Sequence, residues 1–271
     1  MTLKQAFSMC NSHEAIWIIE KATGLTPTQI RLSLPDTELT ETAADFFLFL
    51  LKQRQNGTPL QYILGDWDFM GLTMKCGPGV LIPRKDTEIL AEEAIAFVST
   101  LPKMPAVLDL CTGTGCIGIS IAKFCPFAVV TLSDVSETAL AFARENVDLN
   151  GNHARISVVQ SDLFERITGR FSCITANPPY IPTAEIAELP AEVQKEPVSA
   201  LDGGADGLAF YRRIIQDCHE FLLPRGAIYL EIGDSQAKAV AALLHENNFR
   251  SVVTIKDLEE RNRVVKAIRG K

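Results

Sequence analysis

From residue 105 onward, short apolar segments rich in β-branched residues alternate with helical runs, and this alternation restricts the fold most. The strand-like segments are 106–110, 128–133, 156–160, 173–176, 227–232, 251–255 and 264–268. The helical runs are 115–124, 137–150, 207–222 and 235–247. This order predicts an α/β fold with a mainly parallel sheet covered on both faces. The link before the last strand is too short for a helical crossover, so we expect that strand to be antiparallel.

The first 56 residues have helical periodicity and turn signals but no alternating strands. Thr40 can cap a helix, and Asn56-Gly57 can end it. Its apolar positions recur at helical spacing and are Ala44, Phe47, Leu48 and Leu51. Phe46, Phe49 and Leu50 widen this apolar stripe, so we expect the helix to pack on more than one face. We therefore predict a small helical domain over residues 1–56.

We expect a hairpin connector over residues 57–85, because four glycines stand between short β-prone pieces from residue 58 to residue 85. Asp86 or Thr87 can cap a helix that runs to residue 97, so we expect the main domain to span 86–271. Arg84 is either a solvated residue at the entry to this helix or part of an active-site rim.

A glycine-containing turn, residues 109–115 (Asp-Leu-Cys-Thr-Gly-Thr-Gly), follows the first predicted strand of the sheet and precedes a helical run. A strand, a glycine turn and a helix in this order suit a nucleotide-type ligand above the carboxyl end of a parallel sheet. The spacing differs from the dinucleotide fingerprint. Asp134 closes the second strand, roughly 20 residues past the glycines, where an acid can pair with ribose hydroxyls.

A second motif, Asn177-Pro178-Pro179-Tyr180, directly follows an apolar run at 171–176. Each proline fixes its own φ and disfavours helix at the preceding residue, so the tetrapeptide is stiff. On its own it is either a proline-rich turn with an aromatic plug or a rigid mount for the amide of Asn177. A rigid amide oxygen and a nearby backbone carbonyl can accept hydrogen bonds from a planar NH2 group.

The glycine turn, Asp134, Asp162 and the Asn-Pro-Pro-Tyr motif occur in an order that resembles the Rossmann-like methyltransferases that use S-adenosylmethionine. Within these, the chain is similar to the glutamine N5-methyltransferases of peptide-chain release factors, the HemK type. Further matching segments are 58–65, 81–88, 200–208, 231–236 and 263–265. The resemblance implies a Rossmann-like, seven-stranded sheet. Cys111 departs from the pattern, because the family usually has glycine there.

The resemblance also implies roles for individual residues. The residues it assigns to the cofactor are Asp109, Cys111, Thr112, Gly113, Thr114, Gly115, Asp134, Asp162, Leu163 and Asn177. The residues it assigns to substrate binding are Asn177, Pro178, Pro179 and Tyr180, of which Asn177, Pro178 and Tyr180 are the expected catalytic groups. Asp134 would bind the ribose hydroxyls, and Asp162 with Leu163 would border the adenine. Without the resemblance, Asp162 also fits a surface turn.

The implied reaction is methyl transfer to the glutamine side chain in the Gly-Gly-Gln motif of class 1 release factors. An amide nitrogen is a poor nucleophile because its lone pair is delocalised into the carbonyl. Asn177 and the Pro178 carbonyl can accept its two N–H bonds and orient that lone pair, while Tyr180 flanks the amide plane. Positioning of this kind can lower a barrier by several kcal/mol, up to about 7–11. The helical domain would then either grip the release factor or only stabilise its neighbour.

Two other functions compete with this one. Methyltransferases with related motifs modify exocyclic amines of nucleic-acid bases, but the net charge of −7 argues against broad nucleic-acid binding. A non-catalytic, cofactor-binding interaction module is the other, and the intact Asn-Pro-Pro-Tyr motif counts against it. The Gly-rich segment 202–207 lacks an acid at the twelfth loop position, so it is no EF-hand; it is either a flexible loop or an active-site lid.

The cysteines and histidines indicate the compartment. Seven cysteines form no Cys-x-x-Cys pair, and the odd number argues for a reducing compartment. Four scattered histidines give no zinc spacing, so we expect no metal. The first ten residues lack a signal-peptide pattern, and no uncharged apolar run is long enough for a membrane span. We expect a cytoplasmic protein.

Overall fold

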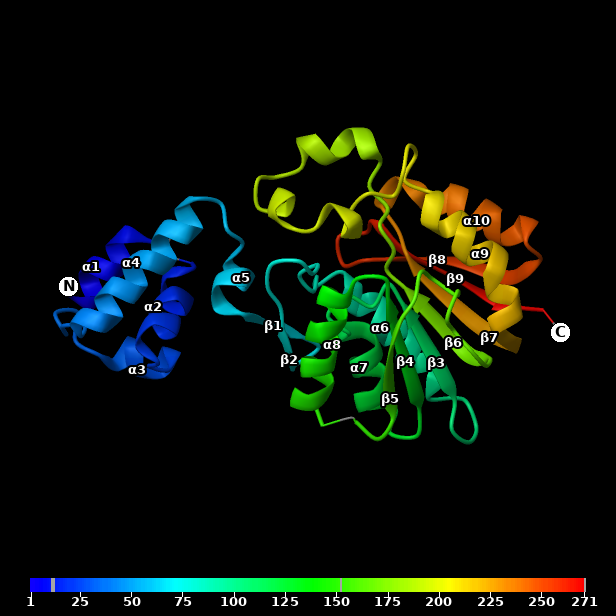
Figure 1. Cartoon of the computed structure of the whole chain (residues 1–271), viewed down its shortest axis with the longest axis horizontal. Helices are drawn as coiled ribbons and strands as arrows, with labels where there is room; N and C mark the ends of the chain where they lie inside the picture. The colour runs from blue at the N-terminus through cyan, green and yellow to red at the C-terminus, as the bar shows by residue number, and fades with distance from the viewer. Residues whose placement is uncertain (11–12, 152, 271) are drawn as a thin grey trace. The chain divides into compact units, whose positions relative to one another are not determined.

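The structure, a computed structural model, describes residues 1–10, 13–151 and 153–270 and divides into two compact units (Figure 1). The helical unit comprises Met1–Asp66 and Pro190–Lys195. The sheet unit comprises Trp67–Leu189 and Glu196–Lys271. A short stretch of the chain between two parts of the sheet unit therefore belongs to the helical unit.

Among the described residues of the helical unit, five helices are formed: α1 (Leu3–Met9), α2 (Ala15–Thr23), α3 (Pro27–Leu32), α4 (Glu41–Gln55) and α5 (Leu60–Leu64). The predicted cap of α4 is confirmed, because the Thr40 hydroxyl accepts the Ala43 N–H at 3.2 Å. The predicted apolar face is partly wrong. Phe47 and Leu51 are buried as expected, and so is Leu50 of the widened stripe, but Leu48 is 42% exposed.

The helical unit extends beyond residue 56, where the glycine-rich connector was expected to begin. The short helix α5, which the sequence did not predict, contacts α2 and α4. Arg54 also pairs with Glu14 at 2.7 Å and with Glu192 of the 190–195 segment at 2.7 Å. These contacts extend the unit to Asp66, so the connector contributes α5 to the helical unit and a hairpin to the sheet unit.

The hairpin and the sheet account for all strands of the described residues. The two-stranded hairpin comprises β1 (Asp66–Phe69) and β2 (Leu72–Lys75), inside the predicted connector. The seven strands of the sheet are β3 (Ala106–Leu110), β4 (Val129–Asp134), β5 (Ile156–Gln160), β6 (Phe171–Ala176), β7 (Leu222–Glu231), β8 (Phe249–Lys256) and β9 (Asn262–Arg269). Their spatial order is β5-β4-β3-β6-β7-β9-β8. β9 runs antiparallel to both neighbours and the other pairs are parallel, as predicted.

Helices cover both faces of this sheet (Figure 1). One face carries α6 (Thr87–Val98), α7 (Cys116–Phe124) and α8 (Glu137–Leu149), and the other carries α9 (Ala209–Phe221) and α10 (Ala237–Glu246). Each face has its own apolar core, with Ile119 and Leu132 in one and Ile174 and Ile214 in the other. Burial of such side chains is worth about 1.5–3 kcal/mol each. This rigid support fixes the carboxyl ends of β3 to β7, where the predicted site residues lie.

In the part of the chain that the structure describes, no helix is long and apolar enough to cross a membrane.

Candidate active site

A pocket of about 940 Å³, measured with its open mouth, lies above the carboxyl ends of β3, β4, β5 and β6. The predicted residues that line it are Cys111, Thr112, Gly113, Thr114, Asp134, Asp162, Leu163, Asn177 and Pro179. The predicted residues outside its lining are Asp109, Gly115, Pro178 and Tyr180. Residues from four separate strand ends thus meet at the switch in strand order, where open α/β sheets bind ligands.

The turn after β3 depends on three residues with positive φ. Gly113 has φ of 56° and Gly115 has φ of 83°. A Cβ on Gly115 would lie 3.0 Å from the Ile119 side chain, which leaves little room for any other residue there. Cys111 has φ of 53°, in the left-handed region that disfavours residues with a Cβ. The position where the resembling family has glycine is therefore one where glycine fits best.

Asp109 supports this turn from below and does not face the pocket. Its side chain is fully buried and accepts the Thr175 hydroxyl at 2.7 Å and the Gly118 N–H at 3.3 Å, as well as the Thr112 hydroxyl. Burial raises the pKa of Asp109 to about 6, against the lowering effect of these three donors. Asp109 therefore links to the turn and lies outside the pocket lining, and its predicted contact with a cofactor stays a prediction.

Asp134 ends β4 and does line the pocket. Its two oxygens accept the backbone N–H groups of Gly113 and Ser136, each at 2.9 Å. Burial raises the pKa of Asp134, while these backbone donors lower it. Next to it, Ser133 also lines the pocket, and its buried hydroxyl has no hydrogen-bond partner among the described residues. The end of β4 therefore offers a carboxylate and an unsatisfied hydroxyl.

Asp162 follows β5 and lines the pocket together with Leu163. Its carboxylate pairs with Arg213 of α9 at 2.9 Å, a partner that the sequence did not indicate. The side chain is therefore part of the pocket wall, although it also makes the ion pair expected of a surface acid. Leu163 is 6% exposed, and its backbone has a φ of 48°.

Asn177 follows β6 and is half-buried at the pocket wall. Its amide nitrogen lies 3.3 Å from the hydroxyl oxygen of Thr87, the first residue of α6. With this contact, the amide oxygen of Asn177 is left for a ligand in the pocket. Thr87 is 2% exposed, so the contact is shielded from water.

The Gly-rich segment after Leu201 packs against the Asn-Pro-Pro-Tyr motif. Its main chain pairs with Ile181 next to the motif, since Ile181 N–H donates to the Leu201 carbonyl at 2.9 Å. A Cβ on Gly203 would lie 2.7 Å from the Tyr180 main chain, and one on Gly207 would lie 2.3 Å from its carbonyl oxygen. Gln236 donates to that same carbonyl at 2.9 Å. The Gly-rich segment therefore holds the motif in place.

Arg84 lies at the pocket rim, one of the two positions that the sequence allowed. It pairs with Glu196, whose other oxygen accepts the Ile82 N–H at 3.0 Å. Glu196 is buried while the Arg84 side chain is 37% exposed, so the pair ties the two rim segments together with the guanidinium still open to water.

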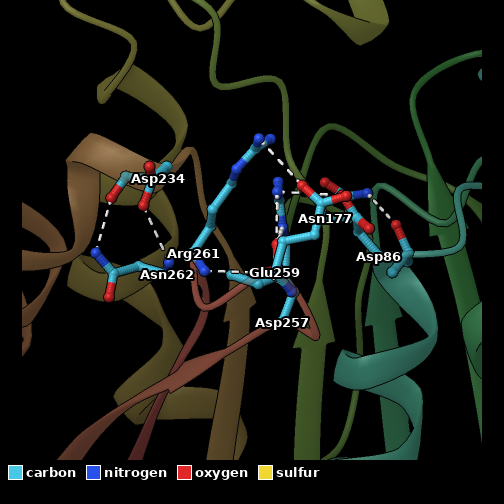
Figure 2. A network of polar contacts seen from close by, with 9 residues as sticks. Asp86, Asn177, Asp234, Asp257, Glu259, Arg261 and Asn262 are labelled. Carbon is cyan, nitrogen blue, oxygen red and sulfur yellow. Dashed lines mark hydrogen bonds and ion pairs between the residues drawn. The ribbon is translucent and has the colours of Figure 1, made fainter.

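Behind Asn177, a polar network surrounds the start of α6 and the β8–β9 turn (Figure 2). Arg263 pairs with Asp86 and with Asp257, each at 3.1 Å. Asp86 occupies the cap position of α6 but makes no side-chain cap bond, so the predicted capping role is wrong and the carboxylate pairs with Arg263 instead. Glu231, buried at the end of β7, faces this network. The sequence showed Glu231 only as part of a matching segment and gave it no role.

S-adenosylmethionine, the cofactor implied by the resemblance, fits the groups around this pocket. Its ribose hydroxyls need an acceptor such as Asp134, and the unsatisfied Ser133 hydroxyl offers a further polar contact. Its charged amino-acid part needs close backbone approach, which the turn at Gly113 permits. Its adenine needs an apolar wall, which Leu163 and Val135 provide.

Comparisons with known proteins agree with this geometry. The Methyltransferase small domain matches residues 90–260, and the PrmC N-terminal domain matches residues 2–65. A release factor glutamine methyltransferase of Thermodesulfovibrio yellowstonii is 40% identical, with 88% of this chain and 86% of that protein covered. One of Geobacter sulfurreducens is 39% identical, with 93% and 87% covered.

A solved structure shares the fold alone. The ribosomal protein L11 methylase of Lactobacillus delbrueckii subsp. bulgaricus has a TM-score of 0.54 at 21% identity, with 72% of this chain and 84% of that chain covered. Both relatives nevertheless agree on the family, and the two domain matches are consistent with it. The chain belongs to the release factor glutamine methyltransferases.

Proposed function

We propose that this protein transfers a methyl group from S-adenosylmethionine to the side-chain nitrogen of the glutamine in the Gly-Gly-Gln motif of class 1 release factors. The observation that carries the proposal is the placement of Asn177 in the wall of the pocket that also contains Asp134 and the glycine turn. Family membership supplies the substrate, because the relatives are release factor glutamine methyltransferases.

The chain's residues hold and orient the reacting groups. Asp134 and Ser133 bind the ribose, the turn at Gly113 accommodates the amino-acid part, and Asp162 with Leu163 borders the adenine. When bound, the cofactor supplies a methyl group on a positively charged sulfur. Asn177 with the Pro178 carbonyl accepts the two N–H bonds of the substrate amide, which aims the nitrogen lone pair. The nitrogen loses one proton to water as it gains the methyl group.

This arrangement favours an amide over an amine. Two acceptors match the two donors of a glutamine NH2 group and leave the third donor of a lysine ammonium unsatisfied. A buried donor without a partner costs about 1–3 kcal/mol. Burial raises the pKa of Tyr180 to about 12, so at neutral pH its side chain is uncharged and offers an aromatic surface.

The helical unit docks the release factor in this proposal. Its exposed apolar side chains support the idea, with Phe49 57% exposed and stacked on Phe46 at 6.4 Å between ring centroids. A release factor as substrate, together with the acidic net charge, favours a protein partner over nucleic acid. The same substrate favours the cytoplasm as the compartment.

Phe49→Asp should raise KM for the release factor without changing cofactor affinity. Phe127→Asp, at the exposed amino-terminal edge of the sheet, is the matched control.

Radiolabelled cofactor tests the function itself. We expect label in a class 1 release factor and none in DNA, RNA or a release factor whose Gly-Gly-Gln glutamine is replaced by alanine. Label in nucleic acid in preference to the release factor would favour the exocyclic-amine alternative and contradict the proposal.

A further inference from the structure

Glu231 lies beside Asn177 at the carboxyl edge of the sheet. Ala176 and Leu230 are register partners in the parallel strands β6 and β7, so Asn177 and Glu231 follow at the same level. Side chains at paired positions of neighbouring strands point to the same face of a sheet. Glu231 is 2% exposed and does not line the pocket, which places its carboxyl group behind Asn177.

Two donors face this buried carboxyl group, the hydroxyl of Thr87 and the amide of Asn177. The same two residues contact each other, with 3.3 Å between the Asn177 nitrogen and the Thr87 oxygen. The Oε2 atom of Glu231 has no hydrogen-bond partner within the described residues. A carboxyl group this deeply buried with spare acceptor capacity is costly for the fold, which points to a functional use.

The donor and acceptor capacities of Glu231, Thr87 and Asn177 determine which group donates in each hydrogen bond. An ionised carboxylate can only accept hydrogen bonds, and a threonine hydroxyl has a single proton to donate. If Thr87 donates to Glu231, the Thr87 oxygen is left as an acceptor for Asn177. Asn177 must then turn its NH2 toward Thr87 and its oxygen toward the pocket. Without the carboxylate, Thr87 can donate to the Asn177 oxygen and the amide can bind in either orientation.

We propose that Glu231 is a positioning residue that acts through Thr87, and through its own contact with the Asn177 amide, to hold that amide with its oxygen toward the substrate. This inference rests on the proposed function, in which that oxygen accepts a substrate N–H bond. It assigns a role to a residue that never touches the reacting atoms.

The inference has a pH consequence. Burial raises the pKa of Glu231 to about 7, and Thr87, Arg263 and Asn177 lower it while Asp86 raises it. The other titratable groups that interact with this carboxyl group are Tyr180, Tyr211 and Cys116. A protonated Glu231 can itself donate to Thr87, so Thr87 is then free to donate to the Asn177 oxygen and the orientation of the amide is no longer fixed. The turnover number should therefore rise as Glu231 ionises.

Glu231→Gln tests the role, because it keeps the shape and removes the acceptor-only end. We expect kcat to fall about tenfold, the value of one hydrogen bond to the substrate, with cofactor affinity unchanged. The rise of kcat near pH 7 should disappear, and the thermal midpoint should not fall, since a buried charge has been removed. In a Thr87→Val background, Glu231→Gln should cause a smaller loss than in the wild type, because only the direct contact with the Asn177 amide remains to be removed. Tyr229→Phe, a buried position on the same strand outside the pocket, should leave kcat unchanged.

A readout without turnover separates this inference from the proposed function. The side-chain NH2 signals of Asn177, observed by NMR in ¹⁵N-labelled protein, should shift with pH near 7 in the wild type and not in Glu231→Gln. This holds even if the release factor is not the substrate. An unchanged kcat and pH profile in Glu231→Gln, additive losses with Thr87→Val, or Asn177 signals that titrate in the variant as in the wild type would overturn the inference.

Discussion

The backbone N–H of Gly113 donates to the carboxylate of Asp134 at 2.9 Å, which joins the turn after β3 to the end of β4. Asp134 is thus placed both to bind a ribose and to fix the turn beside it. Ser136 N–H donates to the other oxygen at 2.9 Å, so the carboxylate is held from two sides. Cofactor affinity should therefore depend on Asp134 more than on any exposed acid.

Replacement of Asp134 by alanine removes this carboxylate from the pocket. Hydrogen bonds to a charged group are worth about 1.5–3 kcal/mol, so the dissociation constant for S-adenosylmethionine should rise roughly 10- to 100-fold. Calorimetric titration measures this directly. Asp148→Ala, at an exposed acid on α8, is the control and should not change affinity. Unchanged affinity in Asp134→Ala would remove this residue from the ribose site.

Cys111 provides a test of backbone strain at the cofactor turn. Its φ of 53° costs a residue with a Cβ about 1–2 kcal/mol. Glycine relieves that strain but loses about 0.5–1 kcal/mol through the unfolded chain, so Cys111→Gly should be neutral to slightly stabilising. Cys111→Val should be clearly destabilising because a β-branched residue is worse at positive φ. The thermal midpoint should be highest for Cys111→Gly, intermediate for the wild type and lowest for Cys111→Val. A highest midpoint for Cys111→Val would contradict this expectation.

Gly207 tests the support of the Asn-Pro-Pro-Tyr motif. A Cβ there would lie 2.3 Å from the Tyr180 carbonyl oxygen, so Gly207→Ala must displace the motif. We expect kcat to fall while cofactor affinity stays within about twofold, because the cofactor-binding strand ends are untouched. Gly169→Ala is a matched control, since Gly169 also has positive φ but no atom within 4 Å of the added Cβ. Equal losses in both variants would show that the effect is conformational cost alone.

Two buried carboxyl groups make stability depend on pH. Burial raises the pKa of Asp109 from 3.8 to about 6 and that of Glu231 from 4.5 to about 7. The folded state therefore binds protons that the unfolded state has released. Stability from these groups is greatest below their ordinary pKa values and is lost as pH rises through about 4 to 7. For Glu231 the loss is roughly 3 kcal/mol.

Urea unfolding at pH 5 and pH 8 measures this dependence. Glu231→Gln removes one of the two groups and should reduce the difference between the two pH values. A variant with the wild-type pH difference would show that Glu231 has an ordinary pKa in the folded protein.

The sheet could be predicted from the sequence because each strand is a short apolar run with a helix or turn between it and the next. β3 and β5 have the bounds that this pattern gives, and the short link before β9 correctly indicates its antiparallel direction. α5 was not predicted, because five residues between Pro59 and Gly65 carry too little periodicity. Leu48 was placed on the wrong face because α4 has apolar residues on several sides.

The pocket residues could be predicted where a motif marks a strand end, as at Asp134, Asp162 and Asn177. The supporting contacts could not, because they join residues far apart in the chain. Thr87 meets Asn177 across 90 positions, and Arg84 meets Glu196 across 112. Nothing local in the sequence specifies such pairs, and the same holds for the bond of Asp109 with Thr175 across 66 positions.

Mass spectrometry of a class 1 release factor treated with the enzyme and S-adenosylmethionine tests the central claim most directly. The proposed function predicts one added methyl group, located by fragmentation on the side-chain nitrogen of the Gly-Gly-Gln glutamine. Asn177→Ala should lose most of this product and still bind the cofactor. A methyl group on lysine or arginine, or an unmodified release factor beside efficiently methylated DNA or RNA, would contradict the assignment.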